Sequence, residues 1–207
     1  MLFKTTNRLF KGIYQYKIVL VVSGASLFRS GDMAATLKEL QKISEDFTNQ
    51  PKYNSIKTKD DLDYALKLQK QVSKLQDFEL RVETPFVSIY SNNWNDINGL
   101  SKLDQDRVKY ISKPADNTTL SAETIIMPKV NFEFRITLGK TTSEHSAFVE
   151  WAKTNKKIKL TKSCVRDLSK DRSWGGTHFY ITGDNNLLMA KMHLGSSINK
   201  VERIIKA

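Results

Sequence analysis

Two stretches decide the fold of this sequence: VSIYSNNWNDINGLSKLDQDRVKYISK at Val87–Lys113 and HFYITGDNNLLMAKMHLGSSINKVERIIK at His178–Lys206. Each begins with a short apolar run, passes through an Asn- and Asp-rich turn into a helical pattern, and ends in a second apolar run. The order and approximate length of these elements agree, although few residues are identical. The sequence therefore predicts that one strand–helix–strand arrangement occurs twice.

The residues before the first stretch extend this pattern. Gln15–Val22 is almost continuously apolar and β-branched, which is typical of a central strand. Two helical patterns follow, one with Asp32 as its N-cap and one from Lys59 to about Leu75. Phe78–Glu83 then alternates between apolar and polar residues, as a half-buried strand does. The first half thus has the order β-α-α-β-β-α-β.

The second half has a similar order. Asn131–Leu138 alternates, with Phe132, Phe134, Ile136 and Leu138 expected to point inward. We expect the remaining elements to be a helix from Ser143, strands at Lys157–Ser163 and His178–Thr182, a helix that Asp184 caps and that runs to about Leu194, and a strand at Lys200–Ile205.

A β-α-β-β-α-β order is that of the ferredoxin-like split βαβ arrangement. The sequence predicts an α+β protein of two tandem ferredoxin-like modules with antiparallel sheets, the first carrying an extra helix. The expected boundaries are 1–113 for the N-terminal module, 114–128 for a polar linker framed by two prolines, and 129–207 for a basic C-terminal module. A single mixed α+β domain is the competing interpretation.

The charge balance favours a polyanionic partner. The formal net charge is +11, and residues 117–207 carry 15 basic and 8 acidic side chains. Cys164 is the single cysteine, so no intrachain disulfide can form, and a reducing, cytoplasmic location is expected. No apolar run approaches the roughly 18–20 residues of a membrane span, so no membrane partner is predicted. Lysine, asparagine and isoleucine, which have AT-rich codons, are frequent. This composition is compatible with a phage, a virus or an AT-rich bacterium, and for a phage or virus the expected location is host cytoplasm or the virion.

The candidate binding residues come from the second half. If helices cover one face of its sheet, alternation places Arg135, Lys159, His178 and Tyr180 on the open face, with Trp174 added by the preceding loop. Segment 153–172 supplies further cations: Lys153, Lys156, Lys157, Lys162, Arg166, Lys170 and Arg172. Cations at this density suit a phosphate backbone and read no base sequence.

Several kinds of chemistry are not indicated. Arg135 stands where an RNA recognition motif would carry an aromatic ring, so the open face is not assigned to that motif. No phosphate-cradling P-loop occurs, and the strand ends lack the paired carboxylates of polymerases. His145, His178, His193 and Cys164 lack metal-ligand spacing. The sequence thus predicts no metal, no cofactor and no catalytic residue.

The preferred hypothesis is a non-enzymatic protein that binds the phosphate backbone of DNA or RNA. Two alternatives stay open. One is a virion or assembly protein that uses its sheet edges and open face for self-association or other protein contacts. The other is a metal-independent ribonuclease built on tandem ferredoxin-like folds, which needs only a general base and a stabilising cation.

Overall fold

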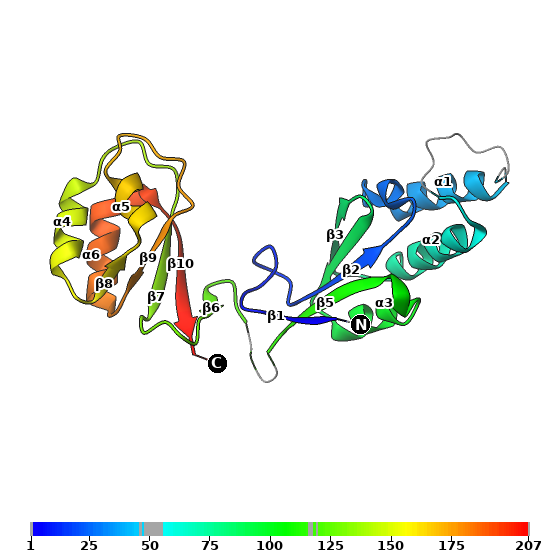
Figure 1. The fold of residues 1–207 in the computed structure, drawn as a ribbon, viewed down its shortest axis with the longest axis horizontal. Helices are drawn as coiled ribbons and strands as arrows, with labels where there is room; N and C mark the ends of the chain where they lie inside the picture. Colours follow the sequence, from blue (N-terminus) through cyan, green and yellow to red (C-terminus); the bar gives the residue numbers. More distant parts are fainter. Residues whose placement is uncertain (1, 46, 48–55, 116–117, 119, 207) are drawn as a thin grey trace. The chain divides into compact units, whose positions relative to one another are not determined.

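The computed structural model of the 207-residue chain describes residues 2–45, 47, 56–115, 118 and 120–206. The chain divides into two compact units, Met1–Thr119 and Leu120–Ala207. Each unit contains a five-stranded sheet with helices, so the class is mixed α+β (Figure 1).

The first unit begins with a strand that the sequence did not predict. Its elements are β1 (Phe3–Thr6), β2 (Tyr16–Val21), η1 (Ala25–Phe28), α1 (Met33–Glu45), α2 (Lys59–Val72), β3 (Phe78–Glu83), β4 (Phe86–Ser91), α3 (Trp94–Ser101), η3 (Gln105–Arg107) and β5 (Val108–Pro114). Asp32 caps α1 as predicted, because its Oδ1 accepts hydrogen bonds of 2.9 and 3.0 Å from the N–H groups of Ala34 and Ala35. Thr58 caps α2 in the same way, accepting from the Asp61 N–H at 3.1 Å.

The second unit contains one helix more than predicted. Its elements are β6 (Thr124–Ile126), β7 (Phe134–Leu138), α4 (Ser146–Thr154), β8 (Ile158–Leu160), α5 (Lys162–Leu168), β9 (His178–Ile181), α6 (Asp184–Leu194), η4 (Gly195–Ser197) and β10 (Ile198–Ile205). The unpredicted helix is α5. Its N-cap is Thr161, whose Oγ1 accepts from the Cys164 N–H at 3.2 Å, so the strand expected at Lys157–Ser163 ends at Leu160.

The two sheets have the same topology. Their strand orders are β1-β5-β2-β4-β3 and β6-β10-β7-β9-β8, which become identical when five is added to each strand number of the first. In both, four strands pair antiparallel and the N-terminal strand adds to the edge in parallel, β1 on β5 and β6 on β10. The prediction of purely antiparallel sheets was therefore wrong. Three-residue β6 and four-residue β1 are too short to give a clear periodic signal.

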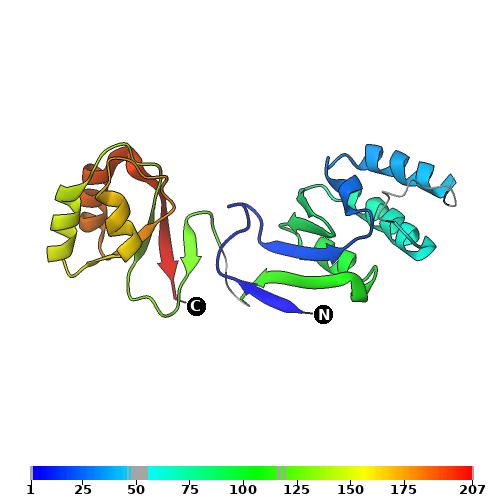
Figure 2. The ribbon, with the colours of Figure 1, turned by 45° about the horizontal axis from the view of Figure 1, so that its top comes forward.

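The helices of each unit pack against one face of its sheet (Figure 2). In the first unit, Ile18 of β2 and Ile89 of β4 are buried in one cluster with Leu40, Leu68 and Leu100 from the three α-helices. In the second, one cluster joins the buried residues of the strands to those of the helices: Phe134, Ile136, Phe179, Ile181, Phe148, Ala152, Cys164, Leu168, Ala190 and Leu194. The inward phase predicted for Phe134, Ile136 and Leu138 of β7 is confirmed.

Three expectations about segment ends need correction. Phe132 was predicted to point inward, but β7 begins only at Phe134, and the Phe132 ring lies against Tyr180 instead. Residues 124–126 were assigned to a linker but form β6. Asp184 is the first residue of α6 rather than its cap, because Gly183 occupies the N-cap position. Linker residues 116, 117 and 119 lie outside the described residues.

Within the described ranges, no helix combines the length and the apolar composition that a membrane span needs.

Candidate nucleic-acid interface

The strand register of the second unit places most of the predicted sheet residues on the face opposite the helices. Arg135 of β7 is the cross-strand partner of Tyr180 on β9, and Tyr180 is the partner of Lys159 on β8. His178 lies one pleat further along β9, opposite Thr137. The structure therefore brings Arg135, Lys159, His178 and Tyr180 together on one face, as the alternation of β7 and β9 indicates.

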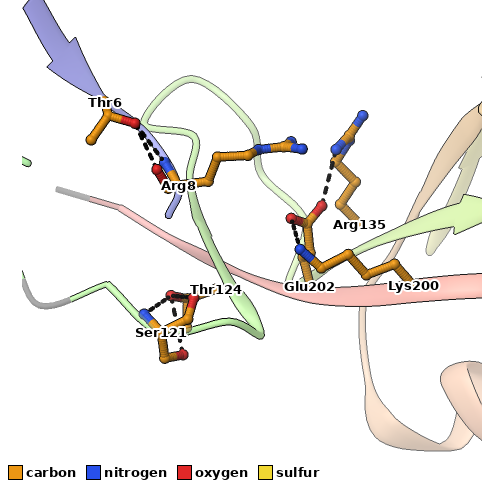
Figure 3. A network of polar contacts seen from close by, with 7 residues as sticks. All are labelled: Thr6, Arg8, Ser121, Thr124, Arg135, Lys200 and Glu202. Atoms are coloured by element: carbon orange, nitrogen blue, oxygen red, sulfur yellow. Dashed lines mark hydrogen bonds and ion pairs between the residues drawn. The ribbon is translucent and has the colours of Figure 1, made fainter. Parts of the chain in front are cut away.

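Arg135 is not available to a phosphate, because it is already paired. Its Nη1 donates a hydrogen bond of 3.0 Å to Oε2 of Glu202, which is the next residue across the sheet on β10 (Figure 3). Lys200 Nζ donates to the other oxygen of the same carboxylate, also at 3.0 Å. The single Glu202 carboxylate thus offsets one of the two positive charges and holds both side chains in place, so this corner of the sheet is a structural ion cluster.

Tyr180 lies at the centre of a small aromatic group. The Phe132 ring stacks on it with centroids 5.8 Å apart and an angle of 29° between the planes. On the other side, His178 Nε2 lies 3.2 Å from the Tyr180 hydroxyl, with the two rings edge to face. These contacts fix the Tyr180 ring, so its orientation is set before any ligand arrives.

A pocket of about 360 Å³ opens beside this stack, and we call it the aromatic pocket. It is lined by Lys129, Val130, Asn131, Phe132, Lys159 and Tyr180. The apolar part of the lining is Val130 with the rings of Phe132 and Tyr180. Lys159 comes from β8, Lys129 comes from the turn between β6 and β7, and no carboxylate lines the pocket. Such a site can accept a flat, anionic ligand, with the ring on Tyr180 or Phe132 and the negative charge on the lysines.

The predicted basic segment is spread over several elements. Lys153 lies in α4, Lys162 and Arg166 lie in α5, and Lys159 alone sits on the open sheet face. Two cations are near acids: Lys153 Nζ is 2.7 Å from Glu150, and Arg166 Nε is 3.9 Å from Asp167. All eight basic side chains are exposed, the others being Lys156, Lys157, Lys170 and Arg172. They form a cationic margin around β8 and α5 rather than one sheet-face patch.

Trp174 is 90% exposed but does not line the aromatic pocket. Its loop is attached to the end of β7, because the Gly176 N–H donates to the Leu138 carbonyl at 2.8 Å. Gly175 has a φ of +76°, and a Cβ there would lie 2.2 Å from the Gly139 carbonyl oxygen. Only glycine allows this approach, so the Trp174 loop is tied to the strand end where β9 begins, away from Phe132.

The remaining side chains that could take part in catalysis or metal binding, His145, His193 and Cys164, are held in structural contacts or buried. His145 Nε2 lies 3.0 Å from Ser197 Oγ, and the His193 ring stacks on Trp151 at 5.5 Å. Burial, with a contribution from Asp167, raises the pKa of the Cys164 thiol to about 12, so it is not a nucleophile near neutral pH. In the part of the chain that the structure describes, no group of three or more His, Cys, Asp or Glu side chains could hold a metal ion.

Lys129 and Phe132 belong to the pocket but were not predicted as site residues. The sequence did contain a signal for them, because Pro128 and Asn131 are poor strand residues and indicate that β7 begins late. A late start frees Phe132 from the inward face of the strand. Comparison of the chain with family models, with curated proteins and with solved structures finds no match in any of the three.

Proposed function

We propose that this protein binds single-stranded nucleic acid without catalysing a reaction on it, and that the aromatic pocket of the second unit holds one base and its phosphate. The observation that carries the proposal is the Phe132–Tyr180 stack with Lys129 and Lys159 beside it. A base stacks on an aromatic ring whatever its sequence, and lysine neutralises phosphate as a point charge.

Single strands are favoured over duplex by the same geometry. The rings are in a pocket, and a base can reach them only if it is unpaired and turned away from its neighbours. Stacking of one base on an aromatic side chain contributes roughly 1–3 kcal/mol, and a lysine–phosphate contact adds an affinity that falls with salt. The cationic margin around β8 and α5 would extend the contact along the backbone in either direction.

The fold class belongs to the same proposal. The antiparallel order β5-β2-β4-β3, with its repeat β10-β7-β9-β8, supports two tandem ferredoxin-like modules, each extended by one parallel edge strand. We assign residues 1–113 to the first module and residues 129–207, with β6 in addition, to the second. In this arrangement helices cover one sheet face and leave the other for a ligand.

The test is binding of the full-length protein to fluorescein-labelled dT12 and U12, followed by anisotropy. Tyr180→Ala should weaken binding about 5- to 150-fold, and Tyr180→Phe, which keeps the ring, should bind nearly as the wild type does. Lys129→Gln with Lys159→Gln should weaken binding and reduce its salt dependence. Lys38→Gln with Lys70→Gln, two exposed lysines on α1 and α2, is the control for net charge.

Two results would overturn the proposal. One is a wild-type protein that binds neither oligonucleotide at low salt. The other is equal binding by wild type, Tyr180→Ala and the pocket lysine variant, which would remove the pocket from the interface.

A protein-assembly role is the second candidate, and one observation favours it. Leu188, Met189 and Met192 of α6 are 59%, 39% and 72% exposed, so this helix presents apolar side chains to solvent. Exposed apolar groups of this kind occur in protein–protein contacts. Light scattering on the purified protein would report an oligomer, and Met192→Glu should dissociate it if α6 forms the contact.

A further inference from the structure

The first unit has an open sheet face of a different character, which the sequence did not indicate. Its register places Lys17 of β2 between Ser112 of β5 and Tyr90 of β4, and places Val19 beside Tyr110. Since Ile18 and Leu20 point to the helices, Lys17 and Val19 point to the other side. We call this surface the lysine–aromatic face, and it comprises Lys4, Lys17, Phe86, Tyr90, Lys109 and Tyr110.

Each lysine of this face lies over an aromatic ring. The Lys4 ammonium is 4.0 Å from the Tyr110 centroid, and the Lys109 ammonium is 3.6 Å from the Phe86 centroid. Lys17 stands between two rings, 5.4 Å from Tyr90 and 5.5 Å from Tyr110. The pairing of β2 with β5 contains a β-bulge between Val19 and Leu20, and Lys109 is the extra residue. The bulge allows the adjacent residues Lys109 and Tyr110 to lie on the same face of the sheet.

The lysines carry uncompensated charge. Among the described residues, Lys4, Lys17 and Lys109 form no ion pair. The acids on the adjoining edge strand β3 are neutralised, because Glu79 pairs with Lys11 and Glu83 with Arg81. An anion that approaches this face therefore meets three ammonium groups without a nearby free carboxylate on β3.

The two sheets differ in the residue that faces the central cation. In both units the central strand carries a cation opposite a tyrosine: Lys17 opposite Tyr90, and Arg135 opposite Tyr180. On the other side of that cation, β10 supplies the acid Glu202, whereas β5 supplies the neutral Ser112. The central cation thus has a carboxylate partner in the second unit, shared with Lys200, and none across the sheet in the first.

Two of the rings are accessible. Tyr110 and Phe86 are half-buried and flank β2 on opposite sides, one pleat apart along it. Tyr90 is buried, because Phe10 and Tyr14 of the segment before β2 pack on it with centroids 5.8 and 6.3 Å away. The face therefore offers two ring surfaces for stacking, those of Tyr110 and Phe86.

We propose that the lysine–aromatic face is a second binding surface for single-stranded nucleic acid, taking one base on Tyr110 and one on Phe86. The inference rests on the proposed function and adds a site to it. In the free protein, Lys4 and Lys109 occupy the ring surfaces. A base displaces each ammonium group from its ring, and the ammonium group then contacts the adjacent phosphate. An exposed cation–π contact is worth less than a stacked base with a lysine–phosphate contact, so the exchange favours the complex.

The test uses full-length protein and fluorescein-labelled dT24 and U24, with a 24-base-pair duplex as a third probe. Lys4→Gln with Lys109→Gln should weaken single-strand binding and flatten the slope of log affinity against log salt by about 1.4, because two phosphate contacts are lost. Tyr110→Ala should weaken it about 5- to 150-fold with no change in slope. Lys38→Gln with Lys70→Gln is again the charge control. The probes dT24 and U24, which differ in the sugar and in the 5-methyl group of the base, compare DNA with RNA, and the duplex should bind more weakly than either.

The outcomes separate this inference from the proposed function. If the Lys129 and Lys159 variant is impaired but the Lys4 and Lys109 variant and Tyr110→Ala both equal the wild type, the inference fails and the proposed function stands. If the reverse holds, the first-unit face is the site and the aromatic pocket is not. If the wild type binds no probe, both fail. Should Tyr110→Ala unfold, as circular dichroism would reveal, the exposed Lys4 and Lys109 variant decides alone.

Discussion

Arg135 and Glu202 face each other across β7 and β10 and are joined by a hydrogen bond of 3.0 Å from Nη1 to Oε2. The sequence predicted that Arg135 contacts phosphate, because alternation places it on the open face. In the structure its neighbour across the sheet is Glu202, which lies 67 residues later in the sequence. A charged side chain on the correct face is therefore a binding residue only if no partner across the sheet neutralises it.

This pair leads to a first prediction, about stability. Arg135→Ala should lower the free energy of unfolding of the second unit by about 1–3 kcal/mol, because the buried Glu202 loses one of its donors. The salt dependence of nucleic-acid binding should stay as in the wild type. Urea titration and anisotropy measure the two quantities, with the exposed Lys191→Ala on α6 as the control. A flatter salt slope with unchanged stability would make Arg135 a phosphate contact after all.

Two phenylalanines two residues apart give a second prediction. Phe134 is buried in the core, so Phe134→Ala should destabilise the second unit by about 3–5 kcal/mol. Phe132 lies on the other side of the chain against Tyr180, so Phe132→Ala should cost far less stability and should weaken binding instead. Phe134→Ala should thus have the lower melting temperature of the two variants, and Phe132→Ala should have the lower oligonucleotide affinity. Equal melting temperatures would mean that the assigned phase of β7 is wrong.

A third prediction concerns acid stability of the first unit. Burial alone would raise the pKa of Asp61, but hydrogen bonds from Arg107, Thr58 and Ser23 and the Arg107 charge lower it overall. A carboxyl whose pKa is lower in the folded state stabilises the fold above its unfolded pKa, about 3.9, and loses that contribution as the pH falls through the folded pKa. The stability difference between wild type and Asp61→Asn should therefore shrink below about pH 4.

Thermal unfolding between about pH 7 and about pH 2.5 measures this difference. Asp63→Asn is the matched control, because Asp63 is an exposed residue of the same helix. A constant difference between wild type and Asp61→Asn over the whole range would show that the Asp61–Arg107 ion pair at 2.8 Å does not contribute to acid stability.

The elements that sequence could predict are those with a strong local signal. β2, β3 and α6 lie within one residue of their predicted ends. β2 contains an unbroken apolar run, β3 alternates between apolar and polar residues, and α6 is bounded by Gly183 and Gly195. β1 and β6 were missed because a strand of three or four residues is held by its neighbour rather than by its own pattern.

The aromatic pocket was predicted in part. Lys159 and Tyr180 follow from alternation, whereas the position of Phe132 depends on where β7 starts. The lysine–aromatic face was missed because Gln15–Val22 looks apolar on both sides, and its pairing partners are set by topology.

The buried thiol gives a fourth prediction. Because burial raises the pKa of the Cys164 thiol to about 12, the thiol stays protonated at pH 8 in the folded protein. A disulfide reagent such as dithiobis(nitrobenzoate) should therefore react with it only when the second unit opens. The reaction should become fast in a urea concentration that unfolds this unit, and Phe134→Ala should accelerate it in the absence of urea. Rapid labelling of the folded wild type would mean that Cys164 is accessible and that the core around α5 is looser than described.

The last prediction tests the cationic margin separately from the pocket. Lys156, Lys157 and Lys162 are exposed, and among the described residues they have no ion pair. If all three contact phosphates of a single strand, changing them to Gln should flatten the salt slope by about two and weaken binding to every sequence alike. Tyr180→Ala should instead lower affinity at every salt concentration in parallel, since a stacked base releases no counterion. The measurement is anisotropy on dT24 between about 50 and about 300 mM salt. If the triple variant retains the wild-type slope, these lysines form a solvated surface, and the phosphate contacts must come from the two sheet faces.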